Sequence, residues 1–163
     1  MQSKNKKAAH AISRRWGGHI KISTKGRYAL QIMMDLAVHN TGEYIALPDI
    51  ATRQELTPKY LEHIAATLSR EGYVESIRGK SGGYRLSRRP SEYRVGDILR
   101  TMEGDLTPVT DRDFPFDHGD PAIAAIAPFW RAFGKVVNEF VDRYTLEDLC
   151  DNYASLIGGD YSI

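Results

Sequence analysis

The side chains best suited to binding chemistry lie in a glycine-rich turn between two short β-prone runs. The runs 73–77 and 84–86 are rich in Tyr, Val, Ile and Leu, which favour strands. Glycines at 79, 82 and 83 give a hairpin tip its backbone freedom. Arg78, Lys80 and Ser81 are then expected to point outward, where a guanidinium can enter a DNA minor groove. The alternatives are a solvated basic turn or a phosphate-cradling loop, but the nucleotide-loop patterns are absent.

Two short helices are predicted just before this hairpin. Residues 47–54 favour one helix. Thr57, as N-cap, and Pro58, in the first helical position, open the next. Only Glu55 and Leu56 separate the two helices. Two short helices joined by so tight a turn and followed by a hairpin predict a winged helix-turn-helix.

The second of these helices has one apolar and one polar face. The apolar residues at helical spacing are expected to face the core: Leu61, Ile64, Ala65 and Leu68. The polar face and its first turn are where a recognition helix contacts bases or phosphates, and the candidates are Thr57, Lys59, Tyr60, Glu62 and His63. A merely solvated polar face is the alternative.

Three segments together resemble the Rrf2 family of bacterial winged-helix regulators, namely 21–30 (KISTKGRYAL), 60–62 (YLE) and 76–84 (SIRGKSGGY). The resemblance runs from about residue 21 to about residue 149. It implies base and backbone contacts for Lys59, Tyr60 and Glu62, and a minor-groove contact for Arg78. It also implies phosphate contacts at the start of the first helix, from Lys21, Lys25 and Arg27.

The charge distribution agrees with a DNA-binding first part. Residues 1–104 carry 18 Lys and Arg against 10 Asp and Glu, whereas residues 105–163 carry 4 against 11. A basic region favours nucleic acid, and an acidic one is better suited to dimerisation or sensing. We therefore expect double-stranded DNA as a partner, although an acidic composition is also normal for a solvated surface.

The expected fold is mainly α with a small β-wing. It comprises a disordered basic extension at 1–20, a winged helix-turn-helix domain at 21–104 and a flexible acidic loop at 105–120. A dimerisation helix with a terminal helix follows at 121–153, and a flexible tail at 154–163. The extension could instead be an auxiliary DNA-binding arm. No membrane span or signal peptide is visible, so a cytoplasmic protein is expected.

The long helix carries large apolar residues at alternating spacings of three and four, typical of a helix that pairs with another helix. They are Ile123, Ile126, Trp130, Phe133, Val137, Phe140 and Tyr144. Packing within the monomer is the alternative to a homodimer. Pro128 indicates that the helix either begins there or is kinked. A twofold dimer would require a pseudo-palindromic operator.

No cofactor is expected. Iron-sulfur members of the family carry three closely spaced cysteines in the segment that corresponds to 105–121, and this segment contains none. Its acidic residues and His118 match no calcium or zinc spacing, so no metal site is predicted. Cys150 is the single cysteine of the chain and is either a packing residue or a redox sensor.

The C-terminus suggests a protein partner. Its last residues resemble the tail by which serine acetyltransferase enters the active site of cysteine synthase: Asp160, Tyr161, Ser162 and Ile163. The chain also resembles cluster-free family members that repress cysteine and sulfur-assimilation genes. The prediction is therefore a repressor with cysteine synthase as partner. A frayed terminus, a regulator that answers to another signal, and a protein that acts chiefly on an enzyme through its tail stay open. No catalytic arrangement is visible.

Overall fold

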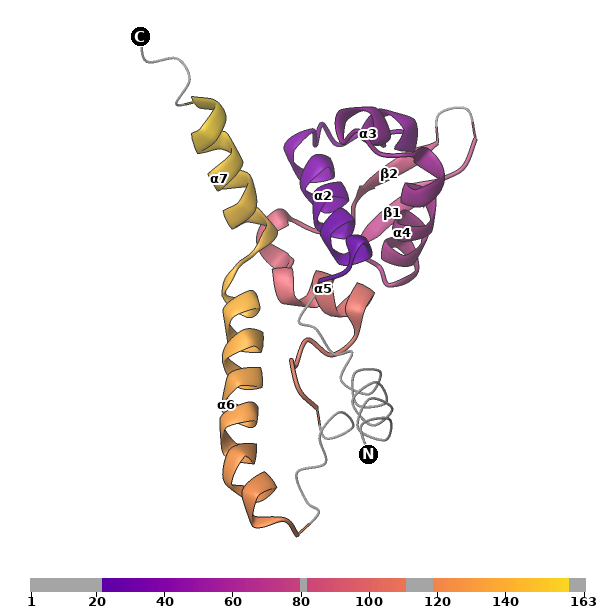
Figure 1. Cartoon of the computed structure of the whole chain (residues 1–163). Coiled ribbons are helices and arrows are strands. Elements are labelled where there is room, and N and C mark those ends of the chain that lie inside the picture. Colours follow the sequence, from indigo (N-terminus) through magenta and orange to yellow (C-terminus); the bar gives the residue numbers. More distant parts are fainter. Residues whose placement is uncertain (1–21, 80–81, 111–118, 159–163) are drawn as a thin grey trace, which may run out of the picture. The chain divides into compact units, whose positions relative to one another are not determined.

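The structure is a computed structural model that describes residues 22–79, 82–110 and 119–158. It is mainly helical with one two-stranded antiparallel sheet, which confirms the predicted fold class (Figure 1). The described residues form two compact units, 22–105 with 140–158, and 106–139. The predicted extension at 1–20 and half of the predicted acidic loop, residues 111–118, lie outside the described residues.

Three helices and the hairpin form the helix-turn-helix and wing of the first unit. α2 spans Thr24–Val38, α3 spans Leu47–Arg53 and α4 spans Pro58–Arg70. The four apolar positions expected on the inner face of α4 are all buried, because they recur at the helical period and meet the apolar side of α2. Figure 1 shows α4 beside the two strands, with α2 and α3 completing the domain.

The hairpin has the predicted strands. β1 (Val74–Ile77) pairs with β2 (Gly83–Leu86) in a register that sets Val74 opposite Leu86 and Ile77 opposite Gly83. The backbone N–H of Ile45 donates to the carbonyl oxygen of Tyr84, and the N–H of Tyr84 donates to the oxygen of Ile45, both at 2.9 Å. The segment before α3 is thereby attached to the edge of the wing.

The chain leaves the wing through a short 3-10 helix, η1 (Pro90–Glu92), and enters α5 (Val95–Glu103). The hydroxyl of Tyr93, a fully buried residue between them, donates to the carbonyl oxygen of Tyr73 at 2.9 Å and accepts from the backbone N–H of Arg88 at 2.7 Å. This bonding holds the base of the hairpin to the start of α5.

Two helices follow. α6 spans Pro121–Arg143 and contains Pro128 in its interior, so the helix does not begin at that proline. α7 spans Leu146–Gly158 and therefore extends beyond residue 153, where the terminal helix was expected to end. A capping box opens α7, because Thr145 Oγ1 accepts from the N–H of Asp148 while Asp148 Oδ2 accepts from the N–H of Thr145. No helix in the described part of the chain is both long and apolar enough to span a membrane.

Candidate nucleic-acid interface

The outer face of α4 carries the residues predicted to contact DNA. Lys59, Glu62 and His63 are exposed, and Tyr60 is half-buried. Thr57 holds the N-cap position with extended backbone angles, as predicted, and its side chain makes no capping hydrogen bond. Pro58 follows at the first helical position, as predicted. The buried inner face fixes the rotation of α4, and its polar residues are left toward solvent.

Tyr60 is positioned by an aromatic partner that the sequence analysis missed. The ring of Tyr28, on α2, meets the ring of Tyr60 edge to face, with centroids 5.5 Å apart and an interplanar angle of 86°. Such pairs stabilise by about 0.5–1.5 kcal/mol beyond the area they bury. α2 therefore supports the first turn of α4. The segment 21–30 named above contains Tyr28, but spacing alone could not show which residue its ring touches.

The start of α2 combines exposed cations with a bound carboxylate. Lys25 and Arg27 are exposed, whereas Lys21 lies outside the described residues. Glu103 Oε1, from the end of α5, accepts hydrogen bonds from the N–H of Ser23 at 3.0 Å, from its hydroxyl at 2.7 Å and from the N–H of Gly26 at 3.1 Å. Glu103 thus supplies the negative charge that a helix N-terminus favours. A phosphate would meet the side chains of the two cations there, because the carboxylate already takes these amide groups.

Gly26 leaves room for the carboxylate of Glu103. A Cβ there would overlap Oε1 of Glu103 and lie 2.9 Å from Cγ2 of Ile22. The close approach of the carboxylate explains why a glycine stands between Lys25 and Arg27. The local sequence shows the motif but not this contact, because Glu103 lies 77 residues away from Gly26.

The wing presents Arg78 directly after the last residue of β1, and its side chain is exposed. Lys80 and Ser81, the other predicted wing contacts, lie outside the described residues. On the outward face of the strands, Arg85 Nη2 lies 2.7 Å from Glu75 Oε2. This ion pair raises the pKa of Arg85 and lowers that of Glu75, so both stay charged at neutral pH.

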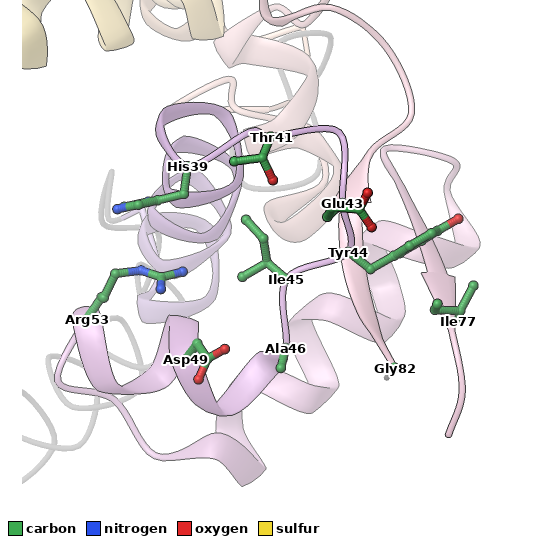
Figure 2. Close-up of a pocket in the computed structure, with 10 residues that line it drawn as sticks. All are labelled: His39, Thr41, Glu43, Tyr44, Ile45, Ala46, Asp49, Arg53, Ile77 and Gly82. Atoms are coloured by element: carbon green, nitrogen blue, oxygen red, sulfur yellow. The ribbon is translucent and has the colours of Figure 1, made fainter. Parts of the chain in front are cut away.

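A surface cavity of about 530 Å³ lies between the wing, α3 and the segment before it. In Figure 2, the side chains of His39, Thr41, Ile45, Asp49 and Arg53 surround one part of this cavity, and Tyr44 and Ile77 lie on its other side. The lining is mixed in charge and polarity, and most of it is solvent-exposed. The cavity therefore adjoins the wing, one of the elements that would contact DNA.

α6 has a broad apolar surface. Its exposed large apolar residues include two that the sequence analysis did not name, Phe129 at 62% and Val136 at 59% exposure, together with Ile126 and Phe140. Trp130, Phe133 and Val137 are half-buried, and Tyr144 beyond the helix is exposed. Gly134, by contrast, is buried against Thr107. A Cβ at position 134 would lie 2.7 Å from Cγ2 of Thr107. The apolar stripe is thus centred differently from the predicted one.

No group of three potential metal ligands occurs among the described residues. Cys150 is half-buried on α7, and its pKa is raised, chiefly by burial. A thiol with a raised pKa is a poor nucleophile, so its surroundings favour packing over redox sensing. The predicted partner-binding tail, Asp160 to Ile163, lies outside the described residues.

Comparison with known proteins agrees with this geometry. The family model Rrf2, described as an iron-dependent transcriptional regulator, matches residues 22–152. The chain is 39% identical over 130 residues to the HTH-type transcriptional regulator CymR of Bacillus subtilis, covering 80% of this chain and 89% of CymR. The solved structure of that CymR, described as the global cysteine regulator, matches with a TM-score of 0.68 over 81% of this chain and 97% of CymR. The structure of IscR from T. potens is 37% identical, with a TM-score of 0.65, over 82% of this chain and 88% of IscR.

Proposed function

Because the chain belongs to the Rrf2 family of transcriptional regulators, we propose that it is a homodimeric repressor that binds double-stranded DNA. The observation that carries this proposal is the common placement of the α4 polar face and the Arg78 wing on one compact unit with a single core. A recognition helix and a wing held by the same core can contact adjacent grooves of one duplex.

Each predicted DNA-binding residue that the structure describes has a role in this proposal. Lys59, Tyr60 and Glu62 contact bases or backbone in the major groove, with Glu62 accepting from a cytosine amino group. Thr57 and His63 flank them on the same helix. Arg78 enters the minor groove, and the phosphate contacts come from Lys25 and Arg27 at the start of α2.

The α6 surface supports dimerisation. Contiguous exposed apolar surface on a soluble protein marks an interaction site, and the residues around Phe129 and Val136 form such a surface along one helix. A second copy offers the same surface, which a twofold axis can pair with itself. Two DNA-binding units would then read a pseudo-palindromic operator.

We further propose that this regulator works without an iron-sulfur cluster. The family description is iron-dependent, but a cluster of this kind needs several cysteine thiolates, and the whole sequence contains one cysteine, on α7. The ligands that this chain offers therefore do not fit a cysteine-held cluster.

The signal in this proposal is cysteine supply, with cysteine synthase as the partner. The 39% identity with CymR supports control of cysteine and sulfur metabolism genes. The C-terminal sequence Asp160 to Ile163 supports the partner, because a terminal carboxylate with an apolar last side chain suits a pocket made for a substrate carboxylate.

DNA binding is tested on duplexes selected from a random pool with the wild-type protein. Arg78→Ala should weaken binding by about 1–3 kcal/mol and reduce the slope of log affinity against log salt by about one. Lys59→Ala and Glu62→Gln should change which sequence is preferred. Arg89→Ala, which removes an exposed cation outside the proposed interface, is the matched control. If none of the three variants differed from this control, the residue assignments would be wrong.

The partner is tested by calorimetry with purified cysteine synthase. The full-length protein should bind, and a version that lacks Ser162 and Ile163 should not, while both retain the same circular dichroism and the same DNA affinity. Equal heats of binding for the two proteins would refute the tail as the contact. The repressor would then answer to another signal.

A further inference from the structure

Asp35 is the one charged residue among the buried residues that the structure describes, and its side chain is fully enclosed. It lies on the inner side of α2. A buried carboxylate is costly unless it is paired and hydrogen-bonded, so its partners decide what it contributes.

The partners come from the end of α3. Arg53 Nε donates to Oδ1 of Asp35 at 3.0 Å, and Arg53 Nη2 donates to Oδ2 at 2.6 Å. Gln54 Nε2 donates to Oδ1 at 3.1 Å. The two parallel bonds from one guanidinium form a fork that fixes direction as well as distance. The hydrogen bond with Asp35 raises the pKa of Arg53 against the opposing effect of burial, so the guanidinium stays charged.

His39 lies beside the carboxylate without replacing either partner. Its Nδ1 is 3.7 Å from Oδ1 of Asp35 and 2.9 Å from the backbone oxygen of the same residue. Arg53 and His39 also line the cavity next to the wing, where the guanidinium end of Arg53 points into the space that Asp49 borders (Figure 2). The ion pair thus connects the domain core with the surface beside the wing.

The ion pair holds the chain where α3 turns toward α4. Arg53 is the last residue of α3 and Gln54 is its C-cap. The next residue, Glu55, has a φ of +53°, the left-handed conformation that reverses the chain direction. α4 begins three residues later, at Pro58. α2 therefore holds the turn through Asp35 and the first turn of α4 through Tyr28.

Stability alone does not explain this arrangement. The carboxylate of Asp35 is buried, whereas the side chain of Arg53 is 34% exposed. Replacing a buried ion pair by apolar residues of similar volume is often neutral or stabilising, whereas removing the partner of a buried charge is strongly destabilising. An apolar pair cannot supply the two parallel hydrogen bonds by which Arg53 fixes the direction of its contact with Asp35. A change of orientation at the turn moves every base-contacting side chain of α4 together, while phosphate contacts tolerate more displacement.

We propose that Asp35 and Arg53 are positioning residues that set the orientation of the helix-turn-helix and thereby the sequence selectivity of DNA binding. The inference rests on the proposed DNA-binding function. Neither residue touches DNA in this proposal. Both act through the turn at 54–57 and the first turn of α4.

The test compares selectivity with stability in the double variant Asp35→Leu with Arg53→Met. Selectivity is the ratio of affinities for a duplex selected by the wild-type protein and for an unrelated duplex. The single variant Asp35→Leu should unfold at a clearly lower urea concentration, and the double variant should recover most of that shift. The double variant should still lose at least tenfold in selectivity, with its affinity for the unrelated duplex within twofold of wild type.

Two further variants keep the test decisive. Arg53→Lys keeps the charge without the fork, and it should remain folded and lose at least threefold in selectivity. Lys135→Gln with Glu139→Gln removes an exposed ion pair of α6, also at no change in net charge, and should leave selectivity unchanged. Wild-type selectivity in Arg53→Lys, or in a folded Asp35→Leu/Arg53→Met protein, would overturn the inference. If the wild-type protein itself showed no sequence preference, the proposed function would fail first.

Discussion

The contact between the wing and the segment before α3 makes Gly83 intolerant of any side chain. A Cβ at Gly83 would lie 2.6 Å from the carbonyl carbon of Ile45 and 3.1 Å from the nitrogen of Ala46. These are backbone atoms, which cannot rotate away. To reach 3.4 Å, the lower limit of ordinary contact, the carbonyl carbon must move by 0.8 Å, the difference between 3.4 and 2.6 Å.

The cost of Gly83→Ala follows from what that movement disturbs. It strains both hydrogen bonds between Ile45 and Tyr84, and each is worth about 0.5–1.5 kcal/mol net. Inserting an extra methyl group into a close-packed contact costs about 1–3 kcal/mol. We therefore expect the free energy of unfolding to fall by about 2–6 kcal/mol.

Urea denaturation followed by circular dichroism measures this change. Gly158→Ala is the matched control, because a Cβ there meets no atom within 4 Å. In a helix, that substitution should be neutral or stabilise by up to about 1 kcal/mol. A Gly83→Ala protein with the same urea midpoint as Gly158→Ala would refute the argument, because it would mean that the segment before α3 can separate from the wing at no cost.

Three further predictions concern the ends of helices and the surface of α6. Glu103→Ala should lower the free energy of unfolding by about 2–3 kcal/mol in urea denaturation, because it leaves three donors without their carboxylate, whereas Glu103→Gln should cost less. Hydrogen bonds from Thr145 lower the pKa of Asp148, so its stabilisation is present above the ordinary carboxyl pKa and is lost as pH falls through the lowered value. Asp148→Asn should therefore flatten the acid side of the stability profile, and an unchanged profile would contradict this. Phe129→Asp should produce a monomer in analytical ultracentrifugation, and Lys135→Asp, on another side of α6, should not.

Local sequence patterns were sufficient to predict most helices and strands of the DNA-binding domain. The inner face of α4, the start of that helix at Pro58 and the two strands of the wing follow from helical spacing, from proline chemistry and from glycine placement. The capping box at the start of α7 follows from residues three positions apart. Each of these features depends on residues close together in the chain, which is why they could be predicted.

Boundaries and helix rotation were predicted less well. The expected end of the terminal helix at residue 153 was wrong, because α7 continues to Gly158 without a residue that stops it earlier. The predicted apolar seam of α6 omitted Phe129 and Val136, since apolar residues surround much of that helix and spacing alone allows several stripes. The contact between Gly134 and Thr107 decides which side of α6 is covered by another part of the chain.

By itself, the sequence determined the order of helices and strands, the basic character of the first part of the chain and the family to which it belongs. Only the tertiary structure decided which distant residues meet. Asp35 meets Arg53, Glu103 meets the start of α2, and Ile45 pairs with Tyr84 of the wing. These contacts join residues 18 to 80 positions apart, so no local pattern records them. They form because burying an apolar core brings the elements together, and each buried polar group must then find a partner among the residues that the core has brought within reach.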